Sequence, residues 1–136
     1  MVIASTNHRL IRRKRVTIAD LATERWILST INTLASQKLF RAFADAGISP
    51  PRVMMRTPSL PLRDILVSST DCLGYSSTRV ARYATPRIRF AEFRVKELAW
   101  IRRVAIAYRK DAYLSPAARR FTEILRVTAR NIAAKS

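Results

Sequence analysis

The chain has very little of the residue types on which many catalytic, metal-binding and disulfide-bonded proteins depend. Its one cysteine, Cys72, excludes an internal disulfide framework and is typical of a reducing cytoplasm. His8 is the only histidine, and with Cys72 it gives too few ligands for an ordinary metal site. Two glycines are too few for a phosphate-binding loop, and no G-x-S-x-G motif is present. We therefore expect no enzymatic activity, no metal and no cofactor.

Long apolar segments are also missing. No apolar run approaches the roughly 20 residues that a membrane span requires, so no membrane partner is expected. Met1–Ala4 is too short for the apolar core of a signal peptide. Together with the single cysteine, these absences favour a cytoplasmic location.

Acidic residues are scarce as well. Nine Asp and Glu stand against 26 Lys and Arg, which gives a formal net charge of +17 at pH 7. Such a charge attracts polyanions and makes association sensitive to salt. Only Arg12–Arg15 forms a continuous basic run, and the other cations are scattered as singles and pairs. We interpret them as a basic solvated surface; non-specific nucleic-acid binding remains the alternative.

Short apolar segments alternate with amphipathic ones along the whole chain. At 136 residues and 49% hydrophobic content, the chain suits one domain or two small lobes. Alternation of strands with helices predicts βαβ units and a mostly parallel sheet. The expected strands are 2–4, 26–28, 53–55, 73–75, 89–93 and a return strand at 99–108. The expected helices are 17–22, 34 to a stop at Gly47, 59–67, a short one from Ser77 or Thr78 to Tyr83, and one capped by Ser115 with Pro116 at its first position.

Each longer helix carries an apolar face that we expect to pack on a core. The expected inward residues are Leu34, Leu39, Phe40 and Phe43 in the first long helix, Leu62, Ile65 and Leu66 in the second, and Leu114, Phe121, Leu125 and Thr128 in the last. Trp26 and Trp100 are expected in the core or at an interface, and Cys72 as a small buried hydrophobe. Tyr75 and Tyr83 could pack in the core or line a cleft.

Hydroxyl and amide side chains follow two of the expected strands. Ligands of open α/β sheets bind at the carboxyl ends of strands, and a helix N-terminus there favours an anion. Plain helix capping is the alternative role for these residues. The candidate ligand-binding residues are Ser29, Thr30, Asn32 and Thr33 after the second strand, and Thr57 and Ser59 after the third.

Five segments, in this order, resemble the effector-binding region of LysR-type transcriptional regulators. Residues 2–10 (V-I-A-S-T-N-H-R-L) are similar to the crossover strand and "H-P-L" element, with Arg9 in place of the usual proline. Residues 16–28 (V-T-I-A-D-L-A-T-E-R-W-I-L) are similar to the "sladLa…pwil" signature. The others are A-F-A-D-A-G-I-S-P-P-R-V-M-M-R-T-P-S-L (42–60), T-D-C-L-G-Y (70–75) and L-S-P-A-A-R-R-F-T-E-I-L (114–125).

The resemblance implies an α/β, periplasmic-binding-protein type 2-like three-layer fold with the second lobe complete and the first partial. Residues 1–25 would be the crossover strand and linker helix, 26–93 the second lobe, and 94–136 the return strand and C-terminal helix of the first lobe. It further implies that Thr57 faces an inter-lobe cleft, that Ser5 and Thr6 contact effector near the hinge, and that His8 is a hydrogen-bonded turn residue.

The implied function is effector sensing in transcription control. The partners would be a small, organic, anionic effector and a second copy of the chain. DNA would be bound only through a winged helix-turn-helix, a pattern that these 136 residues do not show. We therefore expect the chain to be truncated at its N-terminus; a truncated remnant without function is a further alternative.

Overall fold

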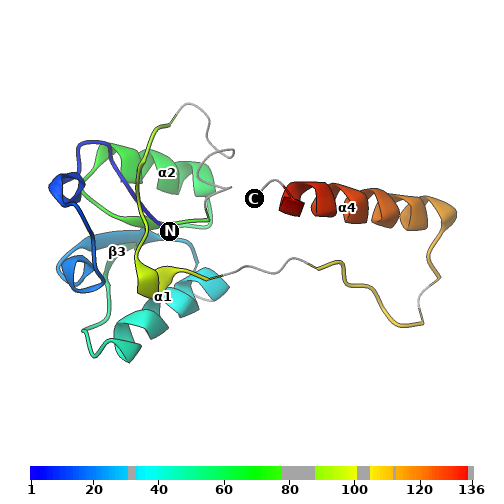
Figure 1. The fold of residues 1–136 in the computed structure, drawn as a ribbon, viewed down its shortest axis with the longest axis horizontal. Helices are drawn as coiled ribbons and strands as arrows, with labels where there is room; N and C mark the ends of the chain where they lie inside the picture. The colour runs from blue at the N-terminus through cyan, green and yellow to red at the C-terminus, as the bar shows by residue number, and fades with distance from the viewer. Residues whose placement is uncertain (31–32, 78–87, 101–104, 112, 135–136) are drawn as a thin grey trace. The chain divides into compact units, whose positions relative to one another are not determined.

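A computed structural model describes residues 1–30, 33–77, 88–100, 105–111 and 113–134. The chain divides into two compact units, Met1–Trp100 and Ile101–Ser136, and we describe each by itself. The expected helix at 78–83 lies outside the described residues. Figure 1 shows the elements of both units.

The described residues of the first unit form five short strands. They are β1 (Val2–Ala4), β2 (Arg25–Leu28), β3 (Arg52–Arg56), β4 (Gly74–Tyr75) and β5 (Ala91–Phe93). Strand β1 pairs antiparallel with β4 and with β5, while β2 pairs parallel with β3. Leu73 joins the two groups, because its carbonyl accepts from Ile27 N–H at 2.8 Å and its own N–H donates to the Arg25 carbonyl at 2.7 Å.

The neighbour order is therefore β3-β2-β4-β1-β5. Strands β2, β3, β4 and β5 run in one direction and β1 runs against them. The expected mostly parallel sheet is confirmed for strand direction, with β1 antiparallel between β4 and β5.

Alternation along the strands sends side chains to opposite faces of the sheet. Ile3 and Ile27 pack with Val67 of α2 (Leu60–Ser69) in one cluster. Trp26, next to Ile27, packs with Phe43 of α1 (Leu34–Asp45) in the other. Helix α1 thus covers one face and α2 the other, which gives the expected three layers (Figure 1).

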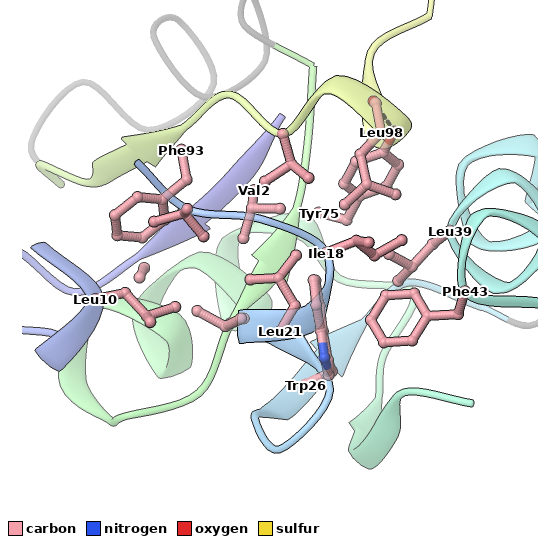
Figure 2. Packing of buried hydrophobic residues seen from close by; sticks show 14 of the residues in the cluster. Val2, Leu10, Ile18, Leu21, Trp26, Leu39, Phe43, Tyr75, Phe93 and Leu98 are labelled. Atoms are coloured by element: carbon pink, nitrogen blue, oxygen red, sulfur yellow. Dashed lines mark hydrogen bonds between the residues drawn. The ribbon is translucent and has the colours of Figure 1, made fainter. Parts of the chain in front are cut away.

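The larger cluster lies on the α1 face of the sheet (Figure 2). Trp26 is fully buried, and its ring meets Phe43 edge-on with 6.2 Å between centroids. The connection from β1 to β2 adds Leu10, Ile18 and Leu21 to this core through two short 3₁₀ turns, η1 (Arg9–Arg12) and η2 (Ala19–Leu21). The sheet is therefore covered on this side by one helix and one folded connection.

Helix α1 begins and ends where the sequence predicts. Thr33 is its N-cap, and its hydroxyl oxygen accepts from the Ser36 N–H at 3.2 Å. Gly47 has a positive φ of +66°. Its N–H donates to the Ala44 carbonyl and the Ile48 N–H donates to the Phe43 carbonyl, and these are the two hydrogen bonds of a Schellman motif. A residue with a side chain is strained at that φ, so glycine suits the stop.

Two expected buried faces are wrong in part. Leu34 is 53% exposed, because it opens α1 at the first helical position, away from the contacts of Leu39 and Phe43. In α2, Leu62 and Ile65 are 41% and 51% exposed. The helix instead buries Val67 together with the polar residues Arg63 and Asp64. Arg63 and Asp64 form an ion pair with each other, so both polar side chains can be buried. The buried face of α2 therefore differs from the face that its apolar residues predict.

The expected helix at 17–22 is only the single 3₁₀ turn η2. Asp20 Oδ2 accepts from the Thr17 N–H at 2.8 Å and from the Thr17 hydroxyl at 2.9 Å. These bonds lower the pKa of the Asp20 carboxyl. The Thr17 hydroxyl thus donates to Asp20, whereas an N-cap hydroxyl oxygen would accept from the backbone.

The second unit contains helix α4 (Pro116–Ala134). Ser115 caps it as expected, accepting the Ala118 N–H at 3.2 Å. The expected return strand is wrong where it is described, since residues 105–108 are exposed and form no strand. Phe121 is 61% and Leu125 37% exposed, so the expected buried face is not packed against the described residues of this unit. An amphipathic helix buries its apolar face only against a second layer, and the described residues of this unit supply none.

Gly74 in β4 gives a first prediction. A Cβ there would lie 2.9 Å from Ile3 Cγ1 and 3.0 Å from Val67 Cγ2. Gly74→Ala should therefore lower the free energy of unfolding by about 1–3 kcal/mol through overpacking. Urea denaturation measures this, and the loss in the double variant with Val67→Ala should be smaller than the sum of the two single losses. A Gly74→Ala protein as stable as the parent would contradict the packing.

Asp20 gives a prediction about pH. Asp20→Ala removes these two hydrogen bonds and the ion pair with Arg13, and should cost about 1 kcal/mol at pH 7. Because the folded-state pKa of Asp20 is lowered, its contribution is complete above the unfolded pKa of about 3.9 and is lost as the pH falls through the folded pKa. Urea titrations of both proteins at pH 7, 5, 4 and 3 should show curves that differ at pH 7 and 5 and converge below pH 4.

Candidate functional site

Most of the expected ligand-binding residues meet at one edge of the sheet. Strands β2 and β3 are parallel neighbours, so the segments that follow them leave the sheet at the same edge. The Thr57 N–H donates to the Leu28 carbonyl at 3.0 Å, which keeps the two exits together beyond the paired residues. Ser29 and Thr30 therefore lie beside Thr57, as the sequence predicts.

The first exit leads into α1 through a short chain of hydroxyl groups. The Thr33 hydroxyl donates to Ser36 Oγ at 3.0 Å, and the Ser36 hydroxyl donates to the Thr30 carbonyl at 3.4 Å. Thr30 itself is exposed, while Thr33 is half-buried. Thr33 is thus the N-cap of α1 and also lies at this edge of the sheet. Asn32 lies outside the described residues.

The second exit leads into α2 and is more enclosed. Thr57 is only 4% exposed, and its hydroxyl oxygen accepts from the Ser59 N–H at 3.1 Å. Ser59 caps α2 by accepting from the Leu62 N–H at 3.3 Å. The capping role considered for Ser59 is confirmed. The buried Thr57 hydroxyl holds the loop between β3 and α2 through this hydrogen bond to Ser59.

Arg56, the last residue of β3, is the residue that the sequence analysis missed. Its Nη1 donates to the Ser29 carbonyl at 3.5 Å, and its guanidinium lies over the Phe40 ring, 5.4 Å from the centroid. Both contacts hold a half-buried cation at the edge where β2 and β3 end. A guanidinium has five N–H donors, which leaves donors for a carboxylate. The available signal was an arginine placed directly before Thr57 at a strand end.

Ser5 and Thr6 do not join this edge. They follow β1, which runs against the other strands, so they lie at the opposite end of the sheet. Ser5 Oγ accepts from the Asn7 N–H at 3.3 Å, and Thr6 is exposed. At the β2–β3 exit edge lies Met1 instead, the residue before β1, whose carbonyl accepts from the Ser76 N–H at 3.0 Å.

His8 occupies that opposite end as a structural residue. Its Nδ1 accepts from the Leu10 N–H at 3.2 Å, so in the neutral ring Nε2 carries the proton and donates to the Asp71 carbonyl at 3.1 Å. The expected hydrogen-bonded turn histidine is confirmed. Next to it, the hydrogen bond from Arg25 lowers the pKa of the exposed Asp71 carboxyl. Cys72 is buried, as expected.

The exit of β4 is fixed by a buried arginine. Arg63 donates to Asp64 Oδ1 from Nε at 2.9 Å and from Nη2 at 2.6 Å. Its Nη1 also donates to the Tyr75 carbonyl at 3.3 Å, and Nη2 to Ser76 Oγ at 3.5 Å. One side chain of α2 thus holds two residues at the end of β4.

Tyr75 packs in the core rather than lining a cleft on this edge. Its hydroxyl donates to the Leu98 carbonyl at 2.8 Å and accepts from Trp100 Nε1 at 2.7 Å. Burial raises the pKa of the Tyr75 hydroxyl. The side chain borders a hollow of about 150 Å³ shared with Lys38, Arg41 and Trp100. Tyr83 lies outside the described residues.

The described part of the chain holds no group of three or more His, Cys, Asp or Glu side chains that could bind a metal ion. None of its helices is both long enough and apolar enough to cross a membrane.

The sequence profile of the LysR substrate binding domain matches residues 1–130. The chain belongs to this family. As a LysR substrate-binding domain it has relatives among transcriptional regulators, and its three-layer α/β architecture is the one expected from the resemblance. A search of curated protein sequences found no match.

Solved structures agree with this LysR-domain fold. HinK, a LysR family transcriptional regulator from Pseudomonas aeruginosa, superposes with a TM-score of 0.65 at 20% identity over 93% of the chain. The effector-binding domain of QuiR in complex with shikimate superposes with a TM-score of 0.60 at 17% identity over 90% of the chain. The chain spans 43% of the HinK chain and 56% of the QuiR chain.

The Arg63–Asp64 pair of this LysR domain gives a third prediction. Arg63→Met leaves a fully buried carboxylate without its guanidinium partner, which should cost about 3–5 kcal/mol in unfolding free energy. Arg52→Met, at an exposed position of β3, is the matched control and should change stability by less than about 0.5 kcal/mol. Thermal and urea denaturation measure both. Equal, small losses would show that the pair does not stabilise the fold.

Proposed function

We propose that this chain is the effector-sensing part of a LysR-type transcriptional regulator and that it binds a small organic anion at the edge where β2 and β3 end. The supporting observation is the position of Arg56, a half-buried cation in hydrogen-bond contact with the Ser29 carbonyl. In this proposal residues 26–93 are the second lobe, residues 1–25 the crossover strand and linker, and residues 94–136 belong to the first lobe.

An anion suits this edge for two physical reasons. The N-terminus of α1 carries the positive end of the helix dipole, and its first N–H groups have no partner within the helix. The Arg56 guanidinium adds a full positive charge beside it, and Thr30 adds an exposed hydroxyl group. The Thr33 hydroxyl would turn from Ser36 Oγ to donate to the anion. Thr57 and Ser59 would position the loop. The QuiR domain was solved with shikimate, a hydroxylated carboxylic acid, which is the ligand chemistry that such groups select.

Binding would act by shifting a conformational equilibrium. An anion held between this edge and a facing lobe favours the closed arrangement only by its difference in affinity for the two arrangements. In a homo-oligomeric regulator, closure would change the geometry presented to DNA by a separate winged helix-turn-helix. The protein would work in the cytoplasm, with no catalytic activity of its own.

Arg56 provides the test of this function. Shikimate and a panel of other small organic acids should include one that raises the melting temperature saturably, since a ligand at 100 times its Kd stabilises by about 2.7 kcal/mol. Arg56→Met should weaken that acid about tenfold to 100-fold, the value of a charged hydrogen bond of about 1.5–3 kcal/mol. Calorimetric titration measures the affinity.

Arg52→Met is the matched control, because Arg52 begins the same strand at its other end and is exposed. It removes one positive charge without changing the proposed site, so the affinity for the acid should stay within about twofold of the parent value. Equal weakening by both variants, or no response to any acid, would contradict the proposal.

A further inference from the structure

The acidic residues of the first unit neutralise particular cations and leave others unpaired. Arg9 pairs with Glu24, and Arg13 pairs with Asp20 at 2.8 Å. Three further ion pairs, Arg25–Asp71, Arg41–Asp45 and Arg63–Asp64, use three more carboxylates. Within the residues that the structure describes, no carboxylate pairs with Arg12, Lys14, Arg15, Arg94 or Lys96.

Two segments far apart in the sequence bring several of these cations together. Residues 15–17, 94–97 and Ala99 line one hollow of about 160 Å³, to which Arg15, Arg94 and Lys96 contribute. Glu97 is the one acidic residue in its lining. Arg12 and Lys14 are exposed on the run that leads into it. The fold therefore brings Arg94 and Lys96, which are isolated cations in the sequence, next to the continuous basic run Arg12–Arg15.

The backbone beneath these cations is held in place. Val16 and Ile18 are buried in the core on one side of the hollow, and Val95 and Leu98 on the other (Figure 2 labels Ile18 and Leu98). Asp20 fixes the same stretch through the Thr17 N–H. Charges carried on an anchored backbone lose less conformational freedom on binding than charges on a free tail.

We propose that Arg12, Lys14, Arg15, Arg94 and Lys96 form a basic surface that binds the phosphate backbone of duplex DNA without reading its sequence. Three of the five are arginines, whose planar guanidinium matches phosphate oxygens in pairs. Single-stranded nucleic acid is disfavoured, because such sites stack bases on aromatic side chains and the lining of this hollow has none. The inference goes beyond effector sensing and stands independently of the Arg56 site.

The expected signature is a steep dependence on salt. Each neutralised phosphate contributes about 0.9 to the slope of log K against log salt, so five contacts give a slope of about −4.5. Between 50 and 200 mM salt, the affinity should then fall about 500-fold. Fluorescence anisotropy of the full chain with a labelled 20-base-pair duplex of arbitrary sequence measures both.

Two variants of equal net charge separate this surface from bulk charge. Arg15→Gln/Arg94→Gln/Lys96→Gln removes three cations from the hollow, and Arg109→Gln/Lys110→Gln/Arg126→Gln removes three exposed cations elsewhere, so both lower the net charge from +17 to +14. The first should reduce the slope by about 2.7 and weaken binding more than about tenfold at 100 mM salt. The second should keep the slope within about 1 of the parent.

A single substitution in the hollow should strengthen duplex binding, whereas the triple variant should weaken it. Glu97→Gln removes the acidic group from the hollow and should tighten duplex binding severalfold while leaving the melting temperature unchanged. Equal losses in the two triple variants, or no effect of Glu97→Gln, would overturn the proposal in favour of diffuse attraction by net charge. Equally tight binding to vesicles of phosphatidylserine at the same salt would overturn the choice of DNA.

Discussion

The first unit depends on the two backbone hydrogen bonds of one residue, Leu73. These bonds join the parallel β2–β3 pair to the three strands around β1, and without them the unit would hold two sheets of two and three strands. A two-stranded sheet such as β2–β3 is only marginally stable alone. Once joined, they form a continuous surface that α1 and α2 cover from opposite sides. The fully buried Leu73 side chain and the close packing of the adjacent Gly74 show how little room this junction leaves.

The same sheet decides which chemistry can be assembled. Strands of one direction end at one edge, so the hydroxyl-rich exit of β2 and the arginine at the end of β3 meet although 27 residues separate Ser29 from Arg56. The reversed direction of β1 carries Ser5 and Thr6 to the other end, where His8, Arg25 and Asp71 form a structural network. A candidate anion site and a structural end thus arise from strand direction alone.

The fold also decides which charged side chains lie close together. Most of the carboxylates of the first unit lie beside individual arginines, and two of these pairs fix turns or strand ends: Asp20 at η2 and Arg63 at the exit of β4. The unpaired cations of segments 12–15 and 94–96 are brought together by the packing of Val16 and Val95 in one core. The net charge of +17 is therefore distributed unevenly over the surface, and the amino-acid composition alone does not show this distribution.

The sequence by itself determined the features that depend on neighbours a few residues apart. The caps at Thr33, Ser59 and Ser115 and the stop at Gly47 are formed by hydrogen bonds spanning three to five residues, and the order of the motifs identified the family. Tertiary structure alone decided which face of α2 is buried, because Arg63 finds its carbonyl partner twelve residues away on β4. It also decided that Arg56 meets Ser29 and that Ser5 does not. These outcomes follow from strand order and direction, which are fixed by pairing between distant segments and leave no local pattern in the chain.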